Sequence, residues 1–396
     1  QAISTLYNFP LSGLDVKTQP IGLVEIGIGT ALPGDMTPPE QTKEFQERLT
    51  RFLANNGQSG TGKVHVQGED GQSWTDGQNS ALERSLDVGV VASANPNSDI
   101  TLYNGSGYNG NAYATTFTAM QSAIWERLHP TSVISSSFWD SQSMSPGSPF
   151  YEAFAQLLVD AALQNQSFFY AVGDGGSGNQ NGNGLTNVTY SITSPYGVMV
   201  GGTSMSTFEA AKNDPTLQAS IVAPALAGNR ATIWQLMAGG LTTLPIKGLP
   251  TQNFVETVWN QYTVDHKQIS GFNGTGYISN NTGSGGIDLT QPTPDYQVDY
   301  GLDPVATDPT RSHGRGVPDV SANAGGNMEY IVPSPDMTGT YYDFGTSAAS
   351  PLWASLAVQI NTIFSDQGLP NLGYMNDLLY RAPPIAPGSF NAVTMG

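Results

Sequence analysis

Two different periods of apolar and polar residues alternate along the first two hundred positions. Short runs rich in apolar and β-branched residues predict strands near 21–28, 63–66, 99–103, 132–137, 168–172 and 197–200. Stretches with apolar residues three or four positions apart predict helices near 38–56, 80–92, 116–128 and 150–165. Strands that alternate with helices in this way predict an α/β fold, with a mostly parallel central sheet and helices on both faces.

The helix expected from residue 38 carries its own start and stop signals. Thr37 is the predicted N-cap, Pro38 occupies the first helical position and Glu40 completes a capping box. Phe45 lies on the apolar face that follows, and Gly57 ends the pattern.

The pattern loosens between residues 205 and 254. Helical stretches near Ala210 and Trp234 are joined by segments that contain Pro and Gly, which predicts an excursion from the surface of the domain. Residues 271–290 are rich in Gly, Asn, Ser and Thr, and we expect a loop or a hairpin there. No repeat and no long linker divides the chain, so residues 1–396 are expected to form a single domain.

Composition narrows the classes of partner. The 396 residues include 14 Lys and Arg against 32 Asp and Glu, a formal net charge of −18, which disfavours nucleic acid and anionic membranes. No apolar run is long enough for a transmembrane helix. Charged residues make up only 12% of the chain, as expected for a protein that stays folded where carboxylates are partly protonated. An ordinary acidic secreted protein has a similar composition.

Two absences also bear on function. The chain has no cysteine, which excludes thiol catalysis, disulfides and cysteine-rich zinc sites. Residues 1–10 lack an initiator methionine, a basic segment and an apolar signal segment, so we expect a mature chain whose signal or pro-segment has been removed. The expected location is extracellular, or the lumen of an acidic compartment.

Residues 345–351, with the sequence Gly-Thr-Ser-Ala-Ala-Ser-Pro, contain the candidate nucleophile. Ser347 lies among small residues, directly before an apolar run that predicts a buried helix. A hydroxyl group at the start of a helix is near the positive end of the helix dipole, and small neighbours let a substrate backbone approach. Such a serine still requires a base that accepts its proton.

Histidine is a poor candidate for that base. His65 lies in a strand pattern, His129 precedes a proline, His266 lies in a polar stretch, and His313 is close to Ser347 in sequence. None lies at the start of a predicted helix, where a subtilisin-type triad places its histidine. Structural or solvated roles are expected for all four.

Carboxylates are better placed. Glu83 and Asp87 are four residues apart on one predicted helix and share a face, beside the apolar stripe that contains Leu82 and Leu86. Two carboxylates this close favour sharing a proton, although a solvated helix face would show the same spacing. Asp174 follows an apolar strand among glycines, where it forms either an ordinary turn or a proton donor for an oxyanion.

The chain resembles the sedolisins, or serine-carboxyl peptidases, along most of its length. Seven short motifs occur in the order typical of that family. They are Glu83-x-x-Leu86-Asp87; Gly173-Asp174-Gly175-Gly176; Val200-Gly201-Gly202-Thr203; Glu256-x-x-Trp259; Ser284-Gly285-Gly286 followed by Pro294-Asp295-Tyr296-Gln297; Arg315-Gly316-Val317-Pro318-Asp319-Val320-Ser321; and Gly345-Thr346-Ser347-x-x-x-Pro351.

The resemblance implies a subtilisin-like fold and a single peptidase domain that hydrolyses peptide bonds in acid. It assigns the nucleophile to Ser347, the general base to Glu83, the orienting carboxylate to Asp87 and the oxyanion-hole acid to Asp174. Substrate-binding walls are expected on either side of the site. The residues expected to form them are Ser135, Ser136, Ser137, Ser284, Gly285 and Gly286.

The chain departs from the family in three places. Phe344 precedes the Gly-Thr-Ser motif where the family usually has a small residue, and the excursion at 205–254 is longer than usual. Sedolisins bind calcium through an aspartate in a Phe-x-Asp-Ile/Val-Thr segment. Ala392 occupies that position here, and its side chain offers no oxygen ligand, so the calcium site is expected to be missing or incomplete. We therefore predict no firm cofactor and no metal ligand.

Two other functions remain open at the level of sequence. One is an inactive or weakly active relative that binds peptides, and the other is a subtilisin-type peptidase active at neutral pH. For the leading hypothesis, the expected partners are protein or peptide substrates and the enzyme's own pro-segment before maturation. A monomer is expected, and either endopeptidase or tripeptidyl-peptidase action is compatible with the motifs.

Overall fold

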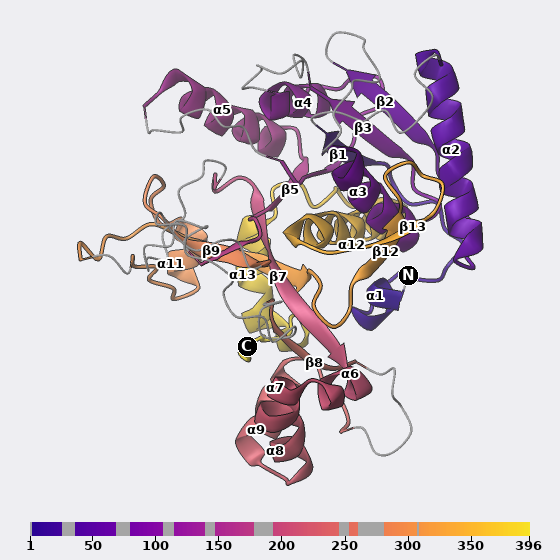
Figure 1. Ribbon diagram of the computed structural model, residues 1–396. Coiled ribbons are helices and arrows are strands. Elements are labelled where there is room, and N and C mark those ends of the chain that lie inside the picture. Colours follow the sequence, from indigo (N-terminus) through magenta and orange to yellow (C-terminus); the bar gives the residue numbers. More distant parts are fainter. Residues whose placement is uncertain are drawn as a thin grey trace, which may run out of the picture.

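A parallel sheet forms the centre of the molecule (Figure 1). The computed structural model describes residues 2–25, 36–68, 80–105, 115–138, 147–177, 193–244, 253–259, 281–306 and 309–396. Within these ranges seven parallel strands lie in the order β11-β7-β5-β4-β1-β3-β2, and β8 pairs with β7 in the antiparallel direction. Their bounds are β1 Ile21–Glu25, β2 Val64–Gly68, β3 Ile100–Asn104, β4 Val133–Ser136, β5 Ser167–Ala171, β7 Val198–Thr207, β8 Asn253–Val258 and β11 Val320–Asn323.

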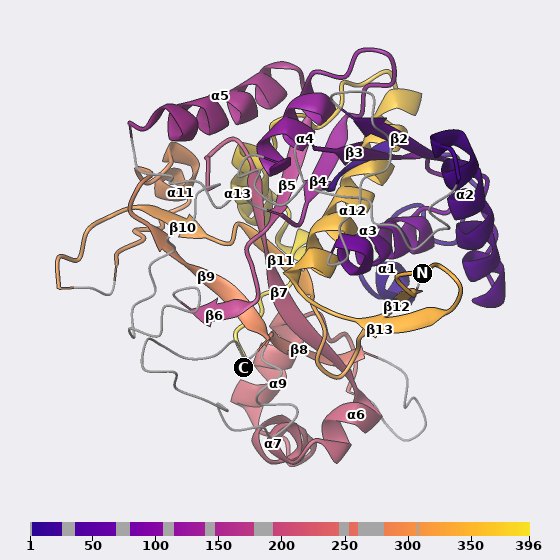
Figure 2. The same ribbon diagram turned by 45° about the horizontal axis from the view of Figure 1, so that its top comes forward.

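Helices cover both faces of this sheet, which confirms the predicted α/β fold (Figure 2). One apolar core joins the sheet to α2, α3 and α12, and a second joins its other face to α4 and α5. Phe169 points into the first core, whereas its neighbours Phe168 and Tyr170 point into the second, as the two-residue period of a strand requires. The bounds of these helices are α2 Pro38–Asn55, α3 Ser80–Ala94, α4 Thr115–Ile124, α5 Pro149–Leu163 and α12 Thr346–Asp366.

The predicted helix boundaries differ in accuracy. Helix α2 begins after Thr37 as predicted, and the Glu40 carboxylate accepts hydrogen bonds from the Thr37 N–H at 2.8 Å and its hydroxyl group at 2.7 Å. For the helix predicted near 116–128, the predicted end is wrong, because α4 ends at Ile124. The Glu126 carboxylate accepts the backbone N–H groups of Leu128 at 2.6 Å and His129 at 3.2 Å, and these bonds form a turn in place of a further helical turn.

Two small sheets lie beside the main one. The predicted loop or hairpin at 271–290 is wrong for its second half, because residues 282–288 form a strand, β9; residues 271–280 lie outside the described residues. This strand pairs with β10 in the antiparallel and with β6 in the parallel direction, so its partners are distant in sequence. The bounds are β6 Gly175–Ser177, β9 Thr282–Asp288 and β10 Arg315–Val317, with a separate hairpin of β12 Tyr330–Pro333 and β13 Thr340–Asp343.

The excursion predicted at 205–254 forms a helical lobe that projects from the sheet near the C-terminus (Figure 1). The helices predicted near Ala210 and Trp234 are present as α6 and α9, and further helical turns connect them. Apolar residues of these helices pack together and against β8. The bounds are α6 Phe208–Asn213, α7 Pro215–Leu217, a π-helical turn at Gln218–Val222, α8 Ala223–Leu226 and α9 Arg230–Ala238.

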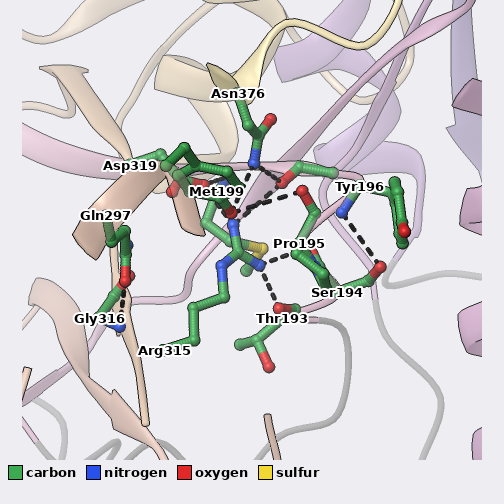
Figure 3. A network of polar contacts seen from close by, with 12 residues as sticks. Thr193, Ser194, Pro195, Tyr196, Met199, Gln297, Arg315, Gly316, Asp319 and Asn376 are labelled. Carbon is green, nitrogen blue, oxygen red and sulfur yellow. Dashed lines mark hydrogen bonds and ion pairs between the residues drawn. The ribbon is translucent and has the colours of Figure 1, made fainter. Parts of the chain in front are cut away.

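A buried ion pair fastens β10 to the sheet (Figure 3). Arg315 and Asp319 are both fully buried, and their charged groups lie 2.5 Å apart. The guanidinium group also donates to the carbonyl oxygens of Thr193, Ser194 and Gly197, which close the turn before β7. The remaining helices, two of which flank this network, are α1 Ala2–Leu6, α11 Asp295–Asp299 and α13 Asn376–Ile385.

Removing the carboxylate of this pair should destabilise the fold strongly. Asp319→Ala would leave the Arg315 guanidinium buried without its counter-charge, and we expect the free energy of unfolding to fall by about 3–5 kcal/mol. Asp377→Ala is the matched control, since Asp377 forms an ion pair with Arg381 at 3.1 Å but is 41% exposed. We expect that change to cost less than about 0.5 kcal/mol. Urea unfolding curves compare the two, and equal losses would contradict the importance of the buried pair.

Candidate active site

Ser347 lies in the first turn of α12, at the position predicted for the nucleophile. The residue before the helix, Gly345, has a φ of 124°, a conformation that residues other than glycine rarely adopt. A Cβ atom there would also lie 2.8 Å from Oδ2 of Asp174. Gly345 is therefore required for the close approach of the helix start to Asp174, and Ser347 is half-buried beside it.

Asp174 is held by the residue next to the serine. Its Oδ1 atom accepts hydrogen bonds from the Thr346 backbone N–H at 2.9 Å and from the Thr346 hydroxyl group at 2.8 Å. The same hydroxyl oxygen accepts the Gly173 N–H at 3.0 Å. Burial raises the pKa of Asp174, although the two bonds from Thr346 partly oppose this. With Oδ1 occupied as an acceptor, Oδ2 is the oxygen suited to carry a proton.

Glu83 and Asp87 approach Ser347 from α3. Ser137 lies between them and the serine, since its hydroxyl group is within 3.1–3.2 Å of both Asp87 oxygens and 3.4 Å from the Ser347 carbonyl oxygen. The Glu83 carboxyl group interacts with the Ser347 hydroxyl group, which lowers its pKa, but burial has the larger effect and raises the pKa to about 7. The carboxylate pair predicted on one helix face is therefore buried beside the serine rather than solvated.

Glu25 is a third carboxyl group in this cluster, and the sequence analysis did not single it out. It is fully buried at the end of β1, and neither of its side-chain oxygens has a hydrogen-bond partner within the described structure. Burial and the neighbouring Glu83 raise the pKa of Glu25, and burial with Glu25 and Glu83 raises the pKa of Asp87. A single acidic residue at the end of an otherwise apolar strand was the signal that could have identified it.

Asp343 adds a fourth acidic group, four residues before Ser347. Its Oδ1 atom accepts the Phe344 N–H at 2.9 Å, and burial raises its pKa to about 6. The charge of Asp343 in turn contributes to the raised pKa values of Glu83 and Asp87. A site crowded with carboxyl groups retains protons that isolated carboxyl groups would lose.

The serines of β4 that were predicted to bind substrate form hydrogen bonds with other residues of the protein. Ser135 and Ser136 are fully buried; the Ser135 hydroxyl group lies 2.8 Å from that of Ser350 in α12, and the Ser136 hydroxyl group bonds to Phe138 backbone atoms. Neither hydroxyl group reaches the surface in this structure. Ser137, predicted as a wall of the same cleft, instead donates to Asp87.

The predicted wall at β9 lies next to the Asp174 turn. The Ser284 hydroxyl group accepts the Gly175 N–H at 3.0 Å, and the Ser284 N–H donates to the Gly173 carbonyl at 2.9 Å. Gly285 and Gly286, which follow in β9, are half-buried. This wall is therefore attached directly to the loop that carries Asp174.

Phe344 has a packing partner that accounts for its size. Its ring lies at 6.3 Å from the indole ring of Trp259, which is fully buried behind the start of α12. The aromatic pair occupies the space where a smaller residue was expected from the family pattern. Trp259 also belongs to one of the seven motifs.

The histidines do not form a catalytic pair with Ser347 in the described structure. His65 and His129 stack on each other at 5.9 Å, and His313 lies 2.7 Å from the exposed carboxylate of Asp303. His266 lies outside the described residues. No group of three or more His, Cys, Asp or Glu in the described ranges is arranged to hold a metal ion. In the same ranges, no helix combines the length and apolar character needed to cross a membrane.

The fold is a mostly parallel sheet covered by helices, and carboxyl groups surround Ser347 at the start of α12. Comparison with known proteins gives the particular relatives. The chain is 28% identical over 384 residues to kumamolisin from Bacillus sp. (strain MN-32), a match that covers 96% of this chain and 54% of that protein. Its structure matches Pseudomonas sedolisin, a serine-carboxyl proteinase solved with two molecules of pseudo-iodotyrostatin, with a TM-score of 0.67 and 18% identity over 100% of this chain and 87% of that chain.

These matches confirm the sedolisin resemblance and the subtilisin-like fold predicted from the motifs. The chain is a relative of the sedolisins. It spans about half the length of kumamolisin. A scan against models of known protein families gives no match.

The raised pKa of Glu83 predicts a measurable effect on stability. The unfolded chain releases this proton near the ordinary value of 4.5 and the folded chain near 7, so between these values the folded state binds more protons and its stability falls as the pH rises. We therefore expect Glu83→Gln to raise the unfolding midpoint, relative to the unsubstituted protein, more at neutral pH than in acid. Differential scanning calorimetry across this interval measures the difference. Glu47→Gln, at an exposed position of α2, should show none, and a Glu83→Gln effect independent of pH would contradict the assignment.

Proposed function

We propose that this protein is an acid-active serine-carboxyl peptidase that hydrolyses peptide bonds through an acyl-enzyme on Ser347. The observation that carries the proposal is that Glu83 on α3 interacts with the Ser347 hydroxyl group, while Asp174 after β5 accepts the backbone N–H of the neighbouring Thr346. Similarity to kumamolisin over almost the whole chain supports the same class of reaction.

In the first step Glu83 accepts the proton of the Ser347 hydroxyl group while the oxygen attacks the carbonyl carbon of the substrate. The carbonyl oxygen becomes an oxyanion, and the protonated Oδ2 of Asp174 donates a hydrogen bond to it. The start of α12 favours negative charge at the same place. Ser137 orients Asp87 by donating a hydrogen bond to it. Asp87 shares with Glu83 the proton that Glu83 accepts from Ser347.

In the second step Glu83 returns the proton to the leaving nitrogen, and the bond between that nitrogen and the carbonyl carbon breaks. Ser347 then holds the acyl group as an ester. A water molecule gives a proton to Glu83 and attacks the ester carbon. Glu83 then returns this proton to the Ser347 oxygen as the bond between that oxygen and the acyl carbon breaks, which releases the carboxylic acid product. One base therefore serves both halves of the reaction.

The pH dependence follows from the two acids. The base system, Glu83 with Asp87 and Glu25, must lose one proton before Ser347 can be activated, whereas Asp174 must keep its proton. Burial raises the pKa of each of these groups. Activity is therefore confined to the pH interval in which the base system has lost one proton and Asp174 still keeps its own. A bell-shaped dependence of kcat/KM on pH is expected.

The two alternative functions find less support. A neutral subtilisin-type peptidase would need a histidine at Ser347, and the described histidines pair elsewhere. A peptide-binding relative without activity would not need the four groups Ser347, Glu83, Asp87 and Asp174 in one place. For the proposed enzyme we infer protein or peptide substrates, its own pro-segment before maturation, a monomeric state, and action outside the cell or in an acidic lumen.

Replacing the nucleophile tests the proposal. Ser347→Ala should lower peptide hydrolysis in acid by a factor of about 10³ or more, and Glu83→Gln should cost nearly as much because the groups act as a unit. Ser365→Ala, at an exposed position later in the same helix, should keep full activity. Cleavage of a denatured protein in acid, followed by mass spectrometry, provides the assay. Retained hydrolysis by Ser347→Ala would overturn the proposal, and the product lengths distinguish endopeptidase from tripeptidyl-peptidase action.

Two substitutions of Asp174 distinguish the effect of its titrating proton from the effect of its side-chain shape. Asp174→Asn keeps an acceptor for Thr346 and supplies a permanent N–H donor, so it should retain at least about tenfold more activity than Asp174→Ala. Its donor does not titrate, and the fall of kcat/KM on the neutral side should therefore move to higher pH. A pH profile of the asparagine variant that is identical to that of the unsubstituted enzyme would show that ionisation of Asp174 does not limit activity.

A further inference from the structure

Residues 390–396 form the C-terminal segment, and they do not suit the calcium ion that sedolisins bind there. Ala392 occupies the position of the ligating aspartate, and calcium requires oxygen ligands. The backbone N–H of Ala392 instead donates to the Ala238 carbonyl at 2.7 Å. Within the described ranges no acidic cluster of three groups is available to replace the missing ligand. The residues present therefore do not fit the ion.

We propose that the helical lobe, residues 208–244, and the C-terminal segment form a lock that holds this end of the domain without a metal. Two backbone hydrogen bonds attach the segment to two different elements. One is the bond from Ala392 to Ala238 at the end of α9, and the other runs from the Val258 N–H in β8 to the Met395 carbonyl at 2.8 Å. The segment thus connects the lobe to the edge of the central sheet (Figure 1).

Apolar packing forms the centre of the lock. Met395 is only 9% exposed and belongs to the apolar core of the lobe, with Leu236 and Leu241 from the lobe and Phe254 and Val255 from β8. Removing these side chains from water stabilises the arrangement without any ion. The lobe therefore has a structural purpose, because its apolar residues belong to the cluster in which Met395 is buried.

A polar contact closes the other end. Gly240 has a φ of 99°, and a Cβ atom there would lie 2.7 Å from Nδ2 of Asn391, so only glycine allows this approach. The Asn391 side chain interacts with the Glu256 carboxyl group and lowers its pKa. Glu256 also accepts hydrogen bonds from the hydroxyl groups of Tyr7, at 2.6 Å, and Thr203. The lock therefore extends from the lobe to β7 and to the first residues of the chain.

A lock of this kind suits an enzyme that works in acid, a consequence that rests on the proposed function. Carboxylate ligands release calcium as they take up protons. The apolar residues named above do not titrate, and the titratable groups at the polar end of the lock are Glu256, Tyr7 and the neighbouring Tyr330. The lock itself does not depend on whether the protein is a peptidase.

Calcium dependence is the first test. Thermal unfolding of the 396-residue chain is measured near neutral pH, after removal of metal with EDTA and again in excess calcium chloride. We expect the two midpoints to agree within about 1 °C, because a ligand that does not bind the folded state cannot stabilise it. A rise of more than about 2 °C with calcium, or a stoichiometric calcium ion in elemental analysis of the untreated protein, would overturn the proposal.

Two methionines that differ in exposure provide the second test. Met395→Ala should lower the unfolding midpoint by about 3 °C or more in the presence of EDTA. Met237→Ala, in α9 of the same lobe but 50% exposed, should change it by less than about 1 °C. Equal midpoints for the two variants would show that Met395 does not hold the lobe to the sheet.

Hydrogen exchange keeps the proposal testable if Met395→Ala does not fold. In the unsubstituted protein with EDTA, the amide hydrogens of Ala392 and Val258 should exchange slowly, because both donate to backbone carbonyls within the lock. Exchange of these amide hydrogens at the rate of an unfolded chain would contradict the proposed lock. None of these measurements uses catalytic activity, so failure of the lock is distinguishable from failure of the peptidase assignment, which Ser347→Ala tests.

Discussion

Burial of several carboxyl groups against the start of one helix is the constraint on which the candidate site depends. Glu25, Glu83 and Asp87 come from β1 and α3 and are enclosed beside α12. A buried charge is costly, and neighbouring carboxylates repel each other, so the cluster holds protons well above the pH at which exposed carboxyl groups lose them. Apolar packing of the sheet and its helices offsets the free-energy cost of this burial. As a result, carboxyl groups that bind protons strongly surround Ser347.

Short side chains connect the carboxyl groups to Ser347 and its neighbours. Ser137 links Asp87 to the backbone of Ser347, and Thr346 links the same helix start to Asp174. Gly345 permits the approach because a side chain at that position would collide with Asp174. Asp87 and Asp174 are therefore attached to the start of α12 through different residues, Ser137 and Thr346.

Regions away from the site use other means of stabilisation. The Arg315–Asp319 pair holds β10 through charge and carbonyl contacts, whereas the lobe and the C-terminal segment depend on apolar burial around Met395. Both features lie at the edges of the sheet. Kumamolisin shares 28% of the aligned residues, so much of the chain differs from it.

The sequence by itself determined the alternation of strands and helices and the capping of α2, and it singled out Ser347, Glu83, Asp87 and Asp174 as candidates, because these inferences depend on local periodicity and short motifs. Only the tertiary structure decided the role of Glu25, the attachment of Ser137 to Asp87, the strand β9 and the packing of Met395. In each of these cases the partners lie far apart in the chain. A local pattern shows which face of an element is apolar, but it does not show which distant element will cover that face.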